Sequence, residues 1–237
     1  MKRWMTTGLA ILAVTALSAP ARAIGPVIDW DPAYFWTSAG TPSFLPPGSV
    51  LRGVGTVSQF GPPLAFLNVT MPGTEYTFFI DGLISGGTNP PIGPPLMQIY
   101  ETPYGGGTID IYADPTPDAT FAPLPPNAAV PATFVDDPPP ILTGIFTGFL
   151  VRTNNFTTFQ TGDMQGNIVW TGGTLFPVLA GGNPEPCPGL FTGGMTWSTA
   201  PGIGIPGYMF RHDGKIDLQC PVPARSETWG KIKQLYR

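Results

Sequence analysis

The sequence predicts an all-β fold, either an antiparallel β-sandwich or a closed barrel of about ten strands, followed by a short C-terminal helix. Short segments with period-two alternation recur along the chain, and in residues 107–113 this places Ile109 and Ile111 on one face of a strand. Glycine and proline contribute 31 residues each, which indicates many turns. Hydrophobic residues still make up 42% of the chain, so a core can form and disorder is not predicted.

Residues 1–23 have the three parts of a secretory signal peptide: a basic start, a short apolar run at 8–17 and a small-x-small cleavage motif at 21–23. The apolar run has about half of the roughly 20 residues that span a bilayer, which disfavours a membrane anchor. No later stretch is long and apolar enough to cross a membrane. We therefore expect export of a mature chain that begins at Ile24, to the periplasm, the cell surface or the medium.

The mature chain is acidic, because loss of Lys2, Arg3 and Arg22 lowers the formal net charge from −4 to −7. Half of its eight remaining bases lie in the last thirteen residues. Nucleic-acid binding requires Lys and Arg to displace counterions, so this composition disfavours a nucleic-acid partner.

The elements expected in the body are short strands separated by turns. Residues 24–47 are an aromatic N-terminal arm with room for one short strand. Strands are predicted at 49–60, 64–70, 75–83, 96–102, 107–113, 142–151, 164–171, 190–198, 207–212 and 215–220. Asn154-Asn155 predicts a turn, and Asp213-Gly214 predicts a type I′ turn that makes the last two strands a hairpin.

A long loop is predicted at 114–140, where nine prolines exclude the interior of a strand or helix. We expect it to pack on the body through Phe121, Leu124, Val130 and Phe134; a domain linker is the alternative. With a packed loop, residues 24–223 form a single β domain.

Residues 224–237 form a cationic amphipathic tail in which Ser226 can cap a short helix. Such a tail packs on the body, docks on a partner or an anionic surface, or stays disordered.

The order of segments resembles that of uncharacterised secreted β-proteins of environmental bacteria. The features that carry the resemblance are the strand at 75–83, the Tyr-Gly-Gly-Gly-Thr-Ile-Asp-Ile-Tyr-Ala-Asp-Pro stretch at 104–115, Pro-Pro-Asn at 125–127 and a late Gly-Gly and Thr-Trp strand. The tail at 227–237 resembles an ending shared by otherwise different exported bacterial proteins. The resemblance implies export and a β-fold, and it transfers no catalytic residue.

The candidate residues for covalent and metal chemistry are few. Cys187 and Cys220 are the only cysteines, and in an exported chain they predict a disulfide. His212 is the only histidine, and no Gly-x-Ser-x-Gly motif is present, so it is assigned to the turn beside it rather than to a triad or a zinc site.

Loop carboxylates offer oxygen ligands for calcium, the one cofactor that the sequence suggests, although none has the EF-hand spacing. The candidate residues are Asp114, Asp118, Asp136 and Asp137, with Asp29 and Asp31 as a further pair. The alternative is that these acids are exposed and form turns.

Two features suggest a carbohydrate ligand. Trp30, Trp36 and Tyr104 can form a platform that stacks on sugar rings, or they can fill the core. A glycosidase requires two carboxylates, and Glu75, Glu101, Asp81 and Asp110 are available in predicted strands, with Glu75 and Glu101 as the first pair to test.

The sequence therefore favours an exported, non-enzymatic surface or extracellular protein with a structural or interaction role. Its partner would be a polysaccharide or another surface protein. A carbohydrate-binding module is the first alternative, and a carboxylate-dependent glycan hydrolase is the second. An outer-membrane barrel ranks last, because proline is dense and long lipid-facing alternation is missing.

Overall fold

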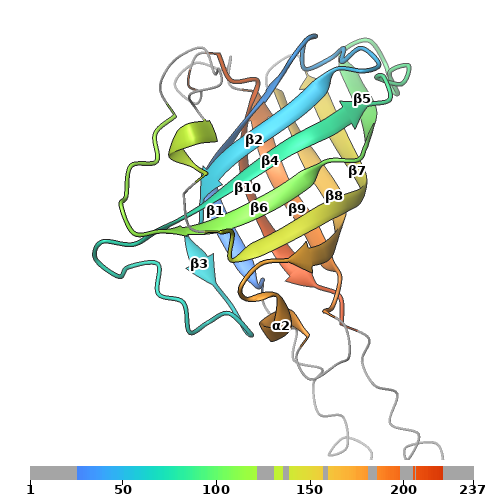
Figure 1. Ribbon diagram of the computed structural model, residues 1–237. Helices are drawn as coiled ribbons and strands as arrows, with labels where there is room; N and C mark the ends of the chain where they lie inside the picture. Colours follow the sequence, from blue (N-terminus) through green and yellow to red (C-terminus); the bar gives the residue numbers. More distant parts are fainter. Residues whose placement is uncertain are drawn as a thin grey trace, which may run out of the picture.

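The computed structural model describes residues 26–121, 131–135, 139–156, 160–180, 186–197, 205 and 207–220. Within them the chain forms a closed antiparallel barrel of eight strands with two outer strands (Figure 1). The strands are β1 (Ile28–Thr37), β2 (Val50–Thr56), β3 (Gln59–Phe60), β4 (Glu75–Ser85), β5 (Met97–Gly105), β6 (Thr108–Asp114), β7 (Leu142–Phe156), β8 (Gln160–Gly172), β9 (Gly189–Trp197) and β10 (Phe210–Leu218). Two short helical elements are η1 (Pro131–Thr133) and α2 (Phe176–Leu179). The predicted all-β fold is confirmed.

The barrel closes because β10 pairs with β1, from Ile28 opposite Ile216 to Phe35 opposite Phe210. Around the barrel, β1 is followed by β2, β4, β6, β7, β8, β9 and β10, each antiparallel to the next. β5 extends the ladder along β7 beyond the end of β6, and β3 pairs with β1. In a sandwich, the edge strands would keep unpaired backbone N–H and C=O groups, whereas closure pairs β1 with β10. The sandwich alternative is not confirmed.

The N-terminal arm contains one strand, β1, which is ten residues long and not short; its alternation is interrupted by a register shift between Trp30 and Ala33. Three other local predictions were wrong, and tertiary pairing explains two of them. The expected turn at Asn154-Asn155 is strand, because β5 and β8 pair with β7 on both sides there. Residues 64–70 form turns rather than a strand.

The predicted C-terminal hairpin is a single strand, because β10 continues through Asp213 and Gly214. Strand β9 pairs with β10 along its whole length, and β1 pairs with its other edge at most positions. Pairing along the whole of one edge and most of the other outweighs the local turn preference of Asp-Gly, so the strand does not fold back on itself.

Aromatic side chains fill the barrel. Trp30, Phe35, Phe78, Phe191 and Phe210 are all fully buried in one continuous cluster. The glycines of β2 make room for these rings, since a Cβ on Gly55 would lie 2.6 Å from the Phe78 ring. The glycines that the sequence suggested as bend points are therefore also required by core packing.

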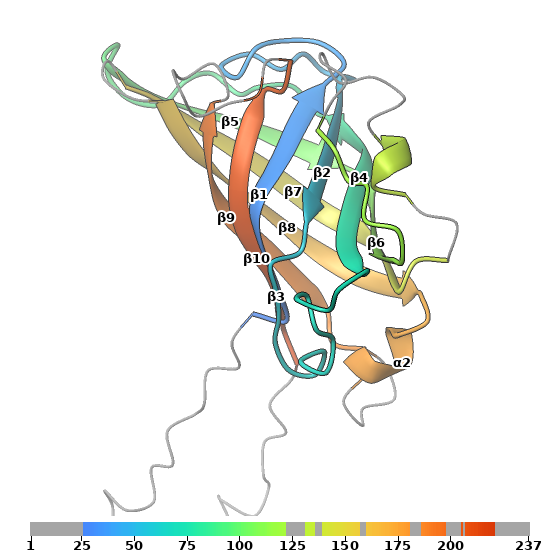
Figure 2. The same cartoon turned by 90° about the vertical axis from the view of Figure 1, so that its left-hand side faces the viewer.

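The outside of β1, β2 and β4 is covered by the proline-rich segment, and we call this side the covered wall. Figure 2 shows the part of the segment that contains η1 lying outside β4. Thr77 Oγ1 on β4 donates a hydrogen bond to the Phe134 carbonyl at 2.9 Å. The buried residues of the covered wall are Tyr34, Trp36, Val54, Phe134 and Tyr208, with Phe121 packed against them. Packing through Phe121 and Phe134 is confirmed, whereas Leu124 and Val130 lie outside the described residues.

The predicted disulfide between Cys187 and Cys220 is present. It joins the segments that precede β9 and follow β10, next to a hydrogen bond from the Gln219 amide to the Pro188 carbonyl at 2.8 Å. β1 begins and β10 ends at the end of the barrel that carries α2 (Figure 1). The predicted signal peptide and the predicted C-terminal helix lie outside the described residues. In the described part of the chain, no helix has the length and apolar character that crossing a membrane requires.

Candidate functional site

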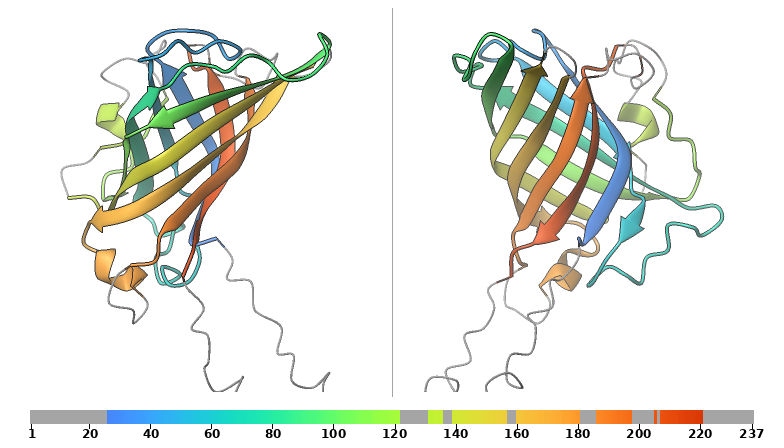
Figure 3. Two further views of the ribbon diagram at one scale, coloured as in Figure 1. Left: turned by 90° about the vertical axis from the view of Figure 1, so that its right-hand side faces the viewer. Right: turned by 180° about the vertical axis from the view of Figure 1, so that it is seen from behind.

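The outer surface of β8, β9, β10 and the first half of β1 carries mostly polar side chains, and we call it the open wall. These strands lie side by side when the barrel is seen from behind (Figure 3, right). Two hollows of about 470 and 480 Å³ lie on this wall, and both are lined by Gly194 and Asp213. Both volumes fall in the range of about 300 to 1,000 Å³ that is usual for small-molecule sites.

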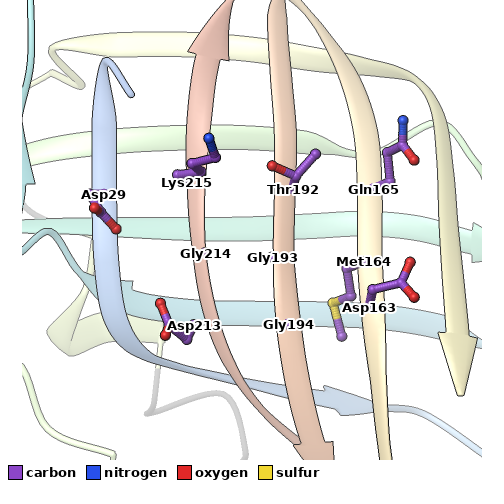
Figure 4. A pocket seen from close by; sticks show the side chains of 10 residues that line it. All are labelled: Asp29, Asp163, Met164, Gln165, Thr192, Gly193, Gly194, Asp213, Gly214 and Lys215. Carbon is purple, nitrogen blue, oxygen red and sulfur yellow. The ribbon is translucent and has the colours of Figure 1, made fainter. Parts of the chain in front are cut away.

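Strand register arranges the lining residues in three rows across β10, β9 and β8. In the middle row, Gly194 lies opposite Asp213 on one side and Asp163 on the other. The rows on either side of it complete a ring of eight polar side chains around Gly194, which we call the polar ring. Its members are Arg211, Asp213 and Lys215 on β10, Thr192 and Thr196 on β9, and Thr161, Asp163 and Gln165 on β8. Figure 4 shows Asp213 and Asp163 on opposite sides of Gly194.

The centre of the polar ring is empty because Gly194 has no side chain. Its φ lies outside the left-handed region, and a Cβ added to it would meet no atom within 4 Å. Neither backbone conformation nor packing therefore requires glycine at this position. Glycine inside a strand weakens the strand, and one of its recognised uses is to let a ligand approach the backbone closely.

Three of the four charged members of the polar ring form ion pairs with residues outside it. Arg211 forms an ion pair with Asp31 at 2.8 Å, and Lys215 forms one with Asp217 at 2.8 Å. On β8, Asp163 lies 3.5 Å from Arg152 of β7. The hydrogen bond from Arg152 to Glu101 and the charge of Asp163 raise the pKa of Arg152, so this neighbour stays cationic.

The inner side of the open wall is packed around His212. The Trp30 Nε1–H group donates to His212 Nδ1 at 3.1 Å, and the imidazole stacks on the Phe191 ring. Burial lowers the pKa of His212 to about 3, because the charged form is disfavoured in this apolar environment. The assignment of His212 to a turn was wrong. A side chain at Gly193 or Gly214 would collide with this ring, so these two neighbours of Gly194 do have a packing reason to be glycine.

The predicted aromatic platform is not formed. Trp30 lies inside the barrel with 1% of its surface exposed. Trp36 is 9% exposed on the covered wall, where it packs edge-on against Tyr208. Tyr104 is 4% exposed and packs against Phe149. None of the three offers an open ring face to a sugar, because closure of the barrel and the covering segment bury them.

The acids proposed for calcium do not converge in the described part of the chain. Asp114 is buried and accepts a hydrogen bond from the Thr116 amide, whereas Asp118 is exposed. Asp136 and Asp137 lie outside the described residues. Asp29 and Asp31 line the two hollows of the open wall. Among the described residues, no three His, Cys, Asp or Glu side chains are grouped as metal ligands.

Glu75 and Glu101 do not form a catalytic pair. Glu75 lies opposite Asp114 at the beginning of β4, where it accepts a hydrogen bond from the Ala119 amide. Glu101 is on β5 and lies opposite Arg152 of β7. Along the ladder, β5 follows the Thr108 end of β6, whereas Glu75 lies at the Asp114 end. Two carboxylates at opposite ends of a ladder cannot flank one glycosidic bond.

The carboxylates that the fold does bring together, Asp163 and Asp213, were not predicted from the sequence. They are 50 positions apart in the chain and become neighbours of Gly194 through strand register. The sequence did contain one indication of the site, the consecutive glycines Gly193-Gly194 in a predicted strand. Two consecutive strand residues point to opposite faces, so one glycine of the pair had to face outward.

The comparisons with known proteins add no family. No protein-family model matches the chain, no curated protein matches it, and no solved structure matches it.

Proposed function

We propose that this protein is an exported, non-enzymatic interaction domain that binds an extracellular ligand at the polar ring. The signal-like residues 1–23 support export, and the Cys187–Cys220 disulfide is compatible with an oxidising compartment. The binding surface would be the open wall, because the covered wall is already occupied by the protein's own proline-rich segment.

The observation that carries the proposal is Gly194. It lies in the middle of β9, at the point where the two hollows meet. A residue that lowers strand stability, and that no local contact requires, is explained if a ligand occupies the space above it.

The test is a binding screen of residues 24–237 against neutral, acidic and basic polysaccharides and basic and acidic peptides, with Gly194→Thr beside wild type. Threonine favours strands and fills the centre of the ring, so we expect binding to fall at least tenfold while the protein stays as stable as wild type. The matched control is Gly148→Thr on β7, where an added Cβ also meets no atom within 4 Å but lines neither hollow.

Binding that is lost in Gly194→Thr and retained in Gly148→Thr supports the proposal. If no ligand binds, or if both variants bind as well as wild type, the polar ring is not the site.

A carboxylate-dependent glycan hydrolase is the second candidate, because strand register places Asp163 and Asp213 on opposite sides of Gly194. Glycosidases hold a sugar between two such groups. This candidate predicts that the wild-type protein releases reducing ends from a glycan and that Asp213→Asn does not. Binding without any release of product favours the non-enzymatic domain.

A further inference from the structure

The polar ring contains equal numbers of acidic and basic side chains. Asp163 and Asp213 lie on either side of the empty centre, and Arg211 and Lys215 lie on the two sides of Asp213 along β10. An anion seated over Gly194 would lie between two negatively charged residues. A cation there would lie near the guanidinium and ammonium groups of β10. An uncharged ligand avoids both repulsions.

The ring also offers hydrogen bonds of both kinds. Carboxylates only accept, Arg and Lys only donate, and Thr and Gln do both. Arg211 is paired with Asp31 of β1 and Asp163 with Arg152 of β7, so these two side chains lean toward the outer edges of the ring. Such a mixed set matches hydroxyl groups, which donate and accept at the same atom.

The shape of the ring fits a small flat molecule. Strand spacing places β8 about 10 Å from β10, and Thr192 and Thr196 lie about 13 Å apart along β9. The floor at Gly194 is one side chain lower than the surrounding rim. A sugar ring has a comparable form, with a flat body and hydroxyl groups at its edge.

We propose that the polar ring binds an uncharged carbohydrate, with one sugar ring seated over Gly194 and its hydroxyl groups hydrogen-bonded to polar side chains of the ring. This inference rests on the proposed function and names its ligand class. Recognition is by a polar rim around a glycine floor, not by stacking on Trp30, Trp36 or Tyr104.

The experiment is calorimetric titration of residues 24–237 with three sets of soluble oligosaccharides: neutral hexose oligomers, uronic acid oligomers and glucosamine oligomers. We expect at least one of the neutral hexose oligomers to bind saturably, with an affinity that changes less than twofold between low and high salt, since no ligand charge is screened. Asp213→Asn and Gly194→Thr should each weaken this binding at least tenfold. Asp110→Asn, which removes an outward carboxylate from β6 on another part of the barrel, should leave it unchanged.

The outcomes separate the two proposals. If only uronic acid or glucosamine oligomers bind, and Gly194→Thr abolishes that binding, the ligand class is wrong but the site and the proposed function stand. If neutral oligomers bind equally well to wild type, Asp213→Asn and Gly194→Thr, the sugar lies elsewhere and this inference is overturned. If nothing in any set or in the wider screen binds, both proposals fail.

Discussion

The covered wall and the open wall have similar inner packing and differ in what lies outside them. Inside, aromatic rings run continuously from Phe78 on β4 to Phe191 on β9. Outside the covered wall, Tyr34 and Trp36 pack against the protein's own Phe134 cluster. Outside the open wall, the described residues form a hollow with a glycine at its centre. The inward side chains of the strands therefore form the barrel core, and the outward side chains determine whether a wall contacts another segment or solvent.

Strand β1 belongs to both walls, which makes the difference visible within ten residues. Before its register shift, Asp29 and Asp31 line the hollows of the open wall. After it, Tyr34 and Trp36 are buried on the covered wall. The outward side chains of β1 are therefore acidic where the strand borders solvent and aromatic where it borders another segment of the protein.

The largest effect on stability is expected at the covered wall. Phe134→Ala removes a fully buried ring and should lower the free energy of unfolding by about 3 to 5 kcal/mol. Phe44→Ala, at a phenylalanine with 60% of its surface exposed, is the control and should change it by less than about 0.5 kcal/mol. Urea titration measures both, and similar losses in the two variants would show that the segment does not stabilise the wall.

The second-largest effect on the free energy of unfolding is expected from the disulfide, because it cross-links the ends of two strands of the open wall. The double variant Cys187→Ser and Cys220→Ser should lose about 3 to 4 kcal/mol, since the unfolded chain gains freedom. Reduced wild-type protein is the control and should unfold at the same denaturant concentration as the double variant. A variant as stable as oxidised wild type would contradict this account.

His212 should make stability depend on pH. Its folded pKa of about 3 lies below the unfolded value of about 6.5, so the unfolded chain takes up a proton first as the pH falls. Stability is complete above pH 6.5 and should fall by up to about 1.4 kcal/mol per pH unit below it.

Between pH 6.5 and 5, before most carboxylates titrate, His212→Gln should remove this slope whatever its absolute stability. Urea unfolding at several pH values gives the slope. A slope that is equal in the variant and in wild type would assign the pH dependence to other groups.

The smallest effect is expected from Arg152 on β7, beside the open wall. Its ion pairs with Glu101 and Asp163 are partly exposed, so Arg152→Gln should cost less than about 1 kcal/mol. If Arg152 helps to hold Asp163, the same variant should weaken ligand binding more than it weakens folding. Parallel unfolding and binding measurements decide this, and a loss of stability as large as that in Phe134→Ala would refute it.

Much of the fold could be predicted from the sequence because strands leave a local pattern. Alternation located β4, β6, β8 and β9 to within a few residues, and cysteine content in an exported chain predicted the disulfide. Local signals failed where a distant partner decided the outcome. Asp213-Gly214 favours a turn in isolation, but pairing with β1 and β9 keeps it in a strand.

The candidate site was less predictable than the fold. Aromatic content suggested sugar binding, yet the sequence cannot say whether Trp30 or Trp36 lies inside the barrel, under a covering segment or in solvent. The polar ring draws its residues from three strands between positions 161 and 215, and no spacing in the chain relates them.

The sequence by itself determined that this chain is a β-protein with one disulfide, because alternation and cysteine content are local or compositional properties. Tertiary structure alone decided that the sheet closes, that one wall is covered, and that Asp163 and Asp213 lie on opposite sides of Gly194. The physical reason is that closure and register depend on pairing between strands far apart in the chain. Those pairings fix which of two alternating faces meets the core, another segment or a ligand.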